Sequence, residues 1–347
     1  KFMEHNIAII GCGDTGNKHS SAWETYNNIN IVAVCDKNIQ RANLLAKKYG
    51  ANVYTSWQNA VAQKNVDIVS VCLPICFHRD VTVASAALGK HILCEKAIAL
   101  SLDEADDMIK ASKKYNVRLS VCHQYRGISR FKVMKGLIKK GRLGYPLNMR
   151  FTEMREVRPK LEMHELYKNG GPLHDFTGHL FDLARYLTES EAISITANGT
   201  INGKNKKRLK TISKFGIDTA ELLARFDGGH SLSIGLSWGL PENTPGHSQE
   251  LIYGPNGMMY SYDPENTNRF IGDLSDSVKI IIKDSHGISY FDCDKDNDGP
   301  HVCISELIDS IKTGKPSQFD GYQGREALKL IITTLKAIKS GELIHFK

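Results

Sequence analysis

Short apolar runs alternate with amphipathic stretches along the first 123 residues of the chain. The runs are rich in Val, Ile, Leu and Cys and show no polar alternation, which is typical of parallel strands covered on both faces. They read NIAIIG, INIVAVCD, DIVSVCLP, KHILCEK and VRLSVCH. The stretches at 39–50, 77–90 and 101–116 have helical spacing, and the last opens with a capping box, Ser101 and Glu104. This alternation predicts an α/β Rossmann domain with a doubly wound parallel sheet over residues 3–123.

The pattern of apolar positions changes after residue 123. Alternating apolar and polar positions now predominate, as in strands with one exposed face. Gly228-Gly229 and Asn256-Gly257 are hairpin signals between such strands. Helical periodicity is found at 126–140, 173–188, 300–313 and 322–340. We therefore expect residues 124–347 to form an α+β domain with a large, mostly antiparallel open sheet.

The composition is that of a globular protein. The 347 residues are 41% hydrophobic and 24% charged, enough for a large core and two domains. The longest apolar stretch, DIVSVCLPICF, is far shorter than the roughly 20 residues that cross a membrane. The N-terminal residues show no signal-peptide pattern, and the eight cysteines include no C-x-x-C pair. We expect a cytoplasmic protein with reduced thiols and no membrane segment.

The net charge of +7 comes largely from one basic run, NGKNKKRLK at 202–210. This run has no interleaved aromatic residues and no recognition-helix pattern, so we expect a solvated hairpin loop and no nucleic-acid partner.

Three glycines follow the first predicted strand in the spacing G-x-G-x-x-G. Gly11, Gly13 and Gly16 open a helix, where such a loop lets a pyrophosphate approach the helix N-terminus. The second predicted strand ends in Asp36, where a carboxylate can bind the ribose hydroxyls of NAD. A glycine-rich turn without a dinucleotide is the alternative. We favour NAD because Asp36 repels a ribose phosphate, while Lys37 leaves NADP possible.

Lys96 directly follows the predicted strand in HILCEK. Ligands of open α/β sheets bind outside the carboxyl ends of the strands. Lys96 is therefore a candidate for the reactive end of a bound cofactor, although a solvent-facing lysine at a strand end is an equally open interpretation.

Charged residues interrupt a predicted buried helix in GGPLHDFTGHLFDLARYL, residues 170–187. Asp175, His179 and Asp182 are spaced i, i+4 and i+7, so they share one polar face. This face fits a metal site, a histidine satisfied within the core, or a proton-transfer site. We expect no metal, because no H-E-x-x-H motif occurs and a calcium-like run at 294–299 has Ser305 where such a loop requires glutamate.

These motifs resemble those of the Gfo/Idh/MocA oxidoreductases, the family of glucose-fructose oxidoreductase and inositol dehydrogenase. After the glycine loop come VCLPICFH, GKHILCEKAIAL, HQYR, GGPLHDFTGHLFDLARYL and DTAELLARFDGG, in the family's order and over nearly the whole chain. The resemblance implies a two-domain fold that holds the substrate between the nicotinamide ring and the open face of the C-terminal sheet.

The resemblance also implies roles for individual residues. Lys96 matches a lysine that contacts substrate and assists proton transfer, and His179 matches the acid/base. Asp175 matches a carboxylate that binds substrate hydroxyls, while Tyr125 and Arg126 match a segment that lines the site. The implied cofactor-binding positions are Gly11, Gly13, Asp14, Thr15, Gly16, Asp36, Lys37, Leu73, Pro74, His78, Glu95, Lys96 and Gln124.

Two positions depart from the family pattern. The family commonly has a proline, often after a cis peptide, where this chain has Ala97, and a cis bond without proline costs about 3–4 kcal/mol. The family's T-P-N-x-x-H reads LPICFH here, so an asparagine near the cofactor is missing. The histidine is kept as His78, which we expect to act structurally or behind the site.

The sequence thus predicts an NAD-dependent dehydrogenase that acts on a secondary hydroxyl of a sugar, a sugar derivative or a cyclitol. One alternative is a redox-neutral enzyme that uses NAD to cleave glycosides, which Ala97 and LPICFH leave open. Another is a non-catalytic sensor of dinucleotide or sugar. Arg155, Arg158 and Trp238 either face the substrate or are surface and core residues. The exposed sheet favours a homo-oligomer, a dimer or tetramer.

Overall fold

The computed structural model describes residues 4–264, 266, 270–271, 277–294 and 300–346. The chain forms two compact units, one made of residues 1–124 and 298–328 and the other of 125–297 and 329–347. Residues 295–299, in the calcium-like run, lie outside the described part of the chain.

Six parallel strands form the sheet of the first unit, in the order β3-β2-β1-β4-β5-β6. They are β1 (His5–Ile10), β2 (Ile29–Cys35), β3 (Asn52–Tyr54), β4 (Ile68–Val71), β5 (His91–Cys94) and β6 (Leu119–Val121). This order is that of a dinucleotide-binding Rossmann sheet, with its switch point between β1 and β4. The predicted doubly wound sheet is confirmed, although the short edge strand β3 has no apolar run that announces it.

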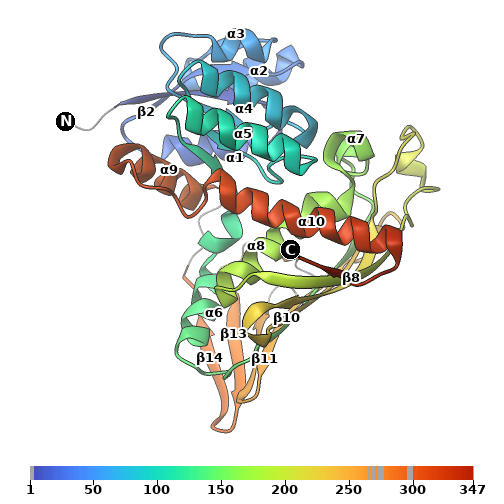
Figure 1. The fold of residues 1–347 in the computed structure, drawn as a ribbon. Coiled ribbons are helices and arrows are strands. Elements are labelled where there is room, and N and C mark those ends of the chain that lie inside the picture. The colour runs from blue at the N-terminus through green and yellow to red at the C-terminus, as the bar shows by residue number, and fades with distance from the viewer. Residues whose placement is uncertain (1–3, 265, 267–269, 272–276, 295–299, 347) are drawn as a thin grey trace. The chain divides into compact units, whose positions relative to one another are not determined.

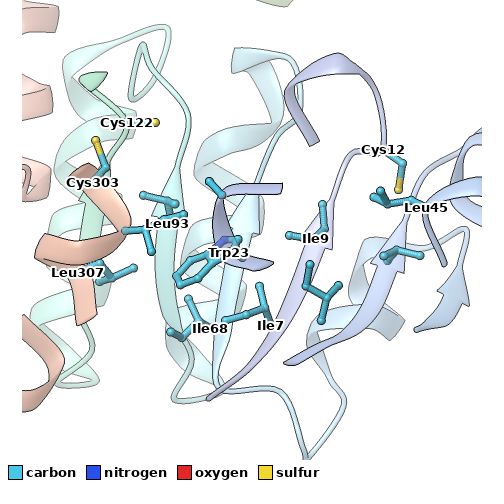
Figure 2. Packing of buried hydrophobic residues seen from close by; sticks show 14 of the residues in the cluster. Ile7, Ile9, Cys12, Trp23, Leu45, Ile68, Leu93, Cys122, Cys303 and Leu307 are labelled. Atoms are coloured by element: carbon cyan, nitrogen blue, oxygen red, sulfur yellow. The ribbon is translucent and has the colours of Figure 1, made fainter. Parts of the chain in front are cut away.

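Helices cover both faces of this sheet. One face carries α1 (Asp14–Glu24), α2 (Ile39–Tyr49) and α9 (His301–Thr313). The other carries α3 (Trp57–Val61), α4 (His78–Ala87) and α5 (Leu102–Lys114), and α5 begins with the predicted capping box. Trp23 of α1 lies in the middle of the first face, packed among Ile7, Ile68 and Leu93 (Figure 2), and has no exposed surface.

Residues 298–328 belong to the first unit although they follow the second unit in the chain. α9 packs against α1, β5 and β6, and its Leu307 joins the core around Trp23 (Figure 2). Val121 donates its N–H to the carbonyl of Phe319 at 2.7 Å, which extends the sheet edge beyond β6. The predicted division at residue 123 differs from the observed units in this returning segment, because periodicity identifies a helix but not the sheet on which it packs.

Nine strands form the sheet of the second unit, in the order β14-β13-β12-β11-β7-β10-β9-β8-β15. They are β7 (Asn148–Glu156), β8 (Ala192–Thr200), β9 (Thr219–Phe226), β10 (Ser231–Leu240), β11 (His247–Gly254), β12 (Gly257–Tyr262), β13 (Lys279–Asp284), β14 (Gly287–Asp292) and β15 (Ile344–His345). The neighbours β7 and β10 run parallel, and the other neighbouring pairs run antiparallel. Both predicted hairpins are present, and Gly228 and Gly229 supply the positive φ angles of the first.

One face of the second sheet is covered by helices (Figure 1). α8 (Pro172–Thr188) packs on β9 and β10, and α6 (Ser129–Lys139) packs on α8 and β13. Every residue of α8 from Pro172 to Arg185 is buried, so its polar side chains lie within the protein. The chain also contains α7 (Leu166–Asn169) and the long α10 (Gly321–Ser340). None of the helices in the described ranges is long and apolar enough to cross a bilayer.

The basic run at 202–210 lies in the connection between the antiparallel neighbours β8 and β9, and most of its residues are exposed or partly exposed, as the sequence suggests. Leu209 is completely buried and packs with Val157 and Ile212. This apolar anchor holds the loop against the end of β7.

Candidate active site

The loop between β1 and α1 is shaped to receive a pyrophosphate. Gly11 has a φ of +100°, and a side chain there would overlap the carbonyl of Cys72. A side chain at Gly16 would overlap the carbonyl of Gly11, whereas no described atom lies within 4 Å of a Cβ built on Gly13. The three glycines therefore provide the tight turn, the close packing and the open approach of a dinucleotide loop. The N-terminus of α1 presents its first amides to this opening.

Asp36 lies beside this loop at the end of β2. One carboxylate oxygen accepts the N–H of Cys12 and the other the N–H of Asn38, each at 2.8 Å. Each oxygen has further acceptor capacity, which a ribose hydroxyl can use. The ammonium of the exposed Lys37 lies 5.5 Å from the ring centroid of Phe77, a cation–π contact. The fixed carboxylate supports NAD over NADP, because it would repel a 2′-phosphate.

His78 holds two loops together. Its side chain has no exposed surface, and its Nδ1 and Nε2 lie 2.9 Å from the carbonyl oxygens of Ala97 and Leu73. Burial lowers the pKa of His78, although the two carbonyls act in the opposite direction. Both ring nitrogens thus face backbone carbonyls inside the protein. These contacts agree with the expectation that His78 acts structurally or behind the site, and the neighbouring Leu73 and Pro74 are partly exposed.

Glu95 and Lys96 follow β5, and the peptide between Lys96 and Ala97 is cis. The carboxylate of Glu95 is directed inward: one oxygen lies 2.8 Å from Nε2 of His19, and the other accepts the backbone N–H of Lys96 at 3.1 Å. Burial raises the pKa of Glu95, but the hydrogen bond and charge of His19 outweigh it, so that the pKa falls below its usual range. The structure thus gives Glu95 partners within the protein.

The chain enters α8 through Gly170 and Gly171, both with positive φ, followed by Pro172 in the first turn. Asp175 lies in this first turn, where the helix dipole favours a carboxylate. Asn169 donates its side-chain amide to Asp175 at 3.3 Å. Asp175 is thus fixed one turn before His179, as the i, i+4 spacing predicts.

Aromatic rings hold the imidazole of His179. The ring of Tyr125 is stacked on it, with centroids 4.1 Å apart and planes inclined by 5°. Phe176 meets the imidazole edge-on, at 6.4 Å and 68°. The Tyr125 hydroxyl donates to the carbonyl of Ile271 at 2.8 Å, which anchors the stack. The second unit therefore brings together Tyr125, Asp175 and His179, three of the predicted substrate-site residues.

Arg126 is paired within the protein. Its guanidinium donates to both oxygens of Asp182, at 2.8 and 2.6 Å, and the two side chains are only 8% and 1% exposed. In this structure Arg126 thus forms a buried ion pair, and its substrate-binding role stays a prediction. The same contact removes Asp182 from the candidates for chemistry on the polar face of α8.

Arg155 is likewise committed within the protein. It forms an ion pair with Glu153, and its guanidinium lies 3.7 Å from the ring centroid of Phe270 and 5.0 Å from that of Trp238. Arg155 is 8% exposed and Trp238 2%. Arg155 thus belongs to a packed ionic and aromatic cluster, and its contact with substrate stays a prediction.

Three further residues near the site, His19, Ser70 and Phe176, have little signal in the sequence. His19 lies on the same face of α1 as Gly16 and Trp23, and a histidine on an otherwise apolar face is the one signal that marks it. Ser70 lies in the fully buried β4, and Phe176 belongs to the apolar stripe of α8. Of the other predicted cofactor positions, Asp14 and Thr15 open α1, and Gln124 is half-buried after β6.

Family models match both parts of the chain. The model described as "Oxidoreductase family, NAD-binding Rossmann fold" matches residues 5–123. The model described as "GFO/IDH/MocA C-terminal domain" matches residues 131–260.

Individual relatives match the chain over nearly its full length. A myo-inositol 2-dehydrogenase from Thermotoga maritima is 26% identical, with 96% of each chain covered. A glucose-6-phosphate 3-dehydrogenase from Bacillus subtilis is 27% identical, and the match covers 93% of this chain and 94% of that protein. The crystal structure of an aldose-aldose oxidoreductase from Caulobacter crescentus has a TM-score of 0.83 at 20% identity, covering 99% of this chain and 100% of that one. This structure has the same fold.

Proposed function

Because the chain belongs to the GFO/IDH/MocA oxidoreductase family, we propose that it is an NAD-dependent dehydrogenase that oxidises a secondary hydroxyl of a sugar, a sugar derivative or a cyclitol. The names of two relatives, a myo-inositol 2-dehydrogenase and a glucose-6-phosphate 3-dehydrogenase, support a cyclic polyol as substrate. The observation that carries the proposal is the imidazole of His179, held against Tyr125 one helical turn from Asp175.

Each of the three proposed catalytic residues has a distinct task. NAD, when bound, supplies the hydride acceptor. His179 takes the proton of the reacting hydroxyl on an imidazole nitrogen, and the stacked Tyr125 keeps the ring plane fixed during this transfer. Asp175 accepts a hydrogen bond from a neighbouring hydroxyl of the substrate. The ammonium of Lys96 donates to the reacting oxygen and stabilises the negative charge that develops there.

The test is the growth of NADH absorbance when purified protein is mixed with NAD and single members of a panel of sugars, sugar phosphates, glycosides and cyclitols. One compound should give NADH, and His179→Ala should lower kcat by about 10²- to 10⁴-fold without weakening NAD binding. His247→Ala, a change at an exposed histidine of the same unit, is the matched control and should keep wild-type kcat. Equal rates for His179→Ala and the wild type would contradict the mechanism. A released aglycone without NADH would indicate glycoside cleavage instead.

The resemblance assigns the substrate to the open face of the second sheet, but Asp175 and His179 lie on α8, which packs on the other, covered face. We further propose that the open face pairs with a second copy of the chain. Ile288 and Tyr290 of β14 are 57% and 64% exposed, and Met258 and Tyr262 of β12 are 43% and 45% exposed. Strand register places Tyr290 beside Ile281, and Ile281 beside Tyr260, on the same face. Apolar side chains gathered in this way are typical of interfaces, and a homo-oligomer buries them by a self-complementary contact.

A further inference from the structure

A buried polar network lies behind Lys96, within the first unit. Nδ1 of His19 lies 2.7 Å from the hydroxyl oxygen of Ser70, and the indole N–H of Trp23 donates to the same oxygen at 3.2 Å. On its other side, Nε2 of His19 lies 2.8 Å from Glu95. His19, Ser70 and Trp23 are at most 1% exposed. The network thus runs from α1 and β4 to the residue that precedes Lys96.

Hydrogen-bond chemistry determines the direction of this network. An ionised carboxylate can only accept, so Nε2 of His19 carries the proton that it shares with Glu95. The Ser70 hydroxyl accepts from Trp23 and can either accept from or donate to Nδ1 of His19. Glu95 then uses its second oxygen to accept the backbone N–H of Lys96 at 3.1 Å. A single carboxylate therefore joins a rigid imidazole to the backbone of Lys96.

We propose that His19 is a positioning residue for Lys96 and acts through Glu95. Without His19, the Glu95 side chain could adopt rotamers that do not accept the Lys96 N–H. The imidazole, which is anchored at Ser70, restricts the carboxylate to one orientation. Lys96 is half-buried and follows the strand whose end should face the cofactor. A displacement of about 1 Å at such a position can cost about a hundredfold in rate. The importance of this positioning for turnover rests on the proposed function.

Electrostatics point in the same direction. The pKa of Glu95 is lowered, as described above. Burial by itself lowers the pKa of His19, but Cys72, Cys122 and Glu95 together hold it above its usual range. Both shifts favour the hydrogen bond between Nε2 of His19 and the carboxylate of Glu95. One potential ligand atom each of His19, Glu95 and Cys122 also lies within 4.8 Å of the other two. The hydrogen bond between His19 and Glu95 accounts for the close approach of these two residues.

Steady-state kinetics and an NMR signal of Lys96 together test this role. We would compare His19→Leu, which removes the donor, with His19→Gln, which keeps an N–H for Glu95. His19→Leu should lower kcat by about tenfold to a hundredfold while the KM for NAD stays within about twofold. His19→Gln should recover most of this loss. Ser21→Ala, at an exposed position of the same helix, is the control for changes in α1.

The NMR readout needs no turnover. Lysines are reductively methylated with ¹³C-formaldehyde, and the Lys96 resonance is identified by its absence in Lys96→Arg. This resonance should move or broaden in His19→Leu and return in His19→Gln. If His19→Leu does not fold, Ser70→Ala, which removes only the rear anchor, should move the same resonance to a smaller extent. A folded His19→Leu or Ser70→Ala with the wild-type resonance would overturn the proposal. If the Lys96 resonance is displaced but the enzyme oxidises none of the panel compounds, the dehydrogenase proposal is contradicted, and the role of His19 in positioning Lys96 still stands.

Discussion

Replacing Arg126 with leucine removes half of a buried ion pair and should destabilise the second unit. The guanidinium makes hydrogen bonds of 2.8 and 2.6 Å to the two oxygens of Asp182, and both side chains are more than nine-tenths buried. Loss of one partner leaves an uncompensated buried charge, which costs about 3–5 kcal/mol. In a unit of this size, this corresponds to a fall of about 6–20 °C in melting temperature.

Calorimetry on Arg126→Leu, Asp182→Leu and the double variant measures this effect as a double-mutant cycle. The double variant should regain at least about half of the lost stability, because it removes both charges and keeps apolar volume in the core. The pair formed by Lys139 and Glu189 in the same unit is exposed, and Lys139→Ala should leave the melting temperature unchanged.

The opposite pattern would refute this reasoning. If Arg126→Leu melts like the wild type and instead raises the KM for the sugar, Arg126 binds substrate and its pairing with Asp182 is incidental.

Three further predictions concern the cofactor site, the pH dependence of stability and the open sheet face. Asp36→Asn removes a negative charge but keeps an acceptor for Cys12 or Asn38, so kcat/KM with NADP should rise at least about tenfold relative to NAD; an unchanged ratio would mean that Asp36 does not select the cofactor. Burial, with His5 and Arg118 nearby, lowers the pKa of His91 to about 4, and its Nδ1 accepts the N–H of Arg118 at 2.9 Å. As the pH falls, His91 is therefore protonated in the unfolded chain before it is protonated in the folded protein. The stability that His91 contributes should be complete above about pH 6.5 and lost as the pH falls toward 4. Urea titrations in this range should show a shallower pH slope for His91→Gln, and equal slopes would exclude His91 as the cause. Ile288→Glu combined with Tyr290→Glu should convert an oligomer to a smaller species in light scattering, and an unchanged mass would place the interface elsewhere.

The fold could be predicted because its signals are local. Apolar runs without alternation identify the parallel strands, and alternation identifies the open sheet, in each case from neighbouring residues. The glycine loop and Asp36 belong to this class, since one strand-turn-helix unit and the end of the next strand position them. The return of residues 298–328 to the first unit has no comparable signal.

The partners of the charged side chains could not be predicted. Arg126 and Asp182 are 56 residues apart, and His19 and Glu95 are 76 apart, so no local spacing links them. The sequence shows that a charged residue lies on a helix face, but it does not show which side chain neutralises that charge. The sequence therefore gives no sign that Arg126 pairs with Asp182 or that His19 pairs with Glu95.

The pairing of Asp182 on α8 follows from the cost of burying a charge. A carboxylate in a buried helix needs a partner, and for Asp182 this partner is Arg126. Tyr125 precedes Arg126 in the chain and stacks on His179, which lies three residues before Asp182 on α8. The consecutive residues Tyr125 and Arg126 thus contact His179 and Asp182 on one side of α8. The ion pair helps to hold the Tyr125 ring against the imidazole. We therefore expect Asp182 to support the proposed proton transfer indirectly, because the ion pair that neutralises its charge also helps to hold Tyr125 against His179.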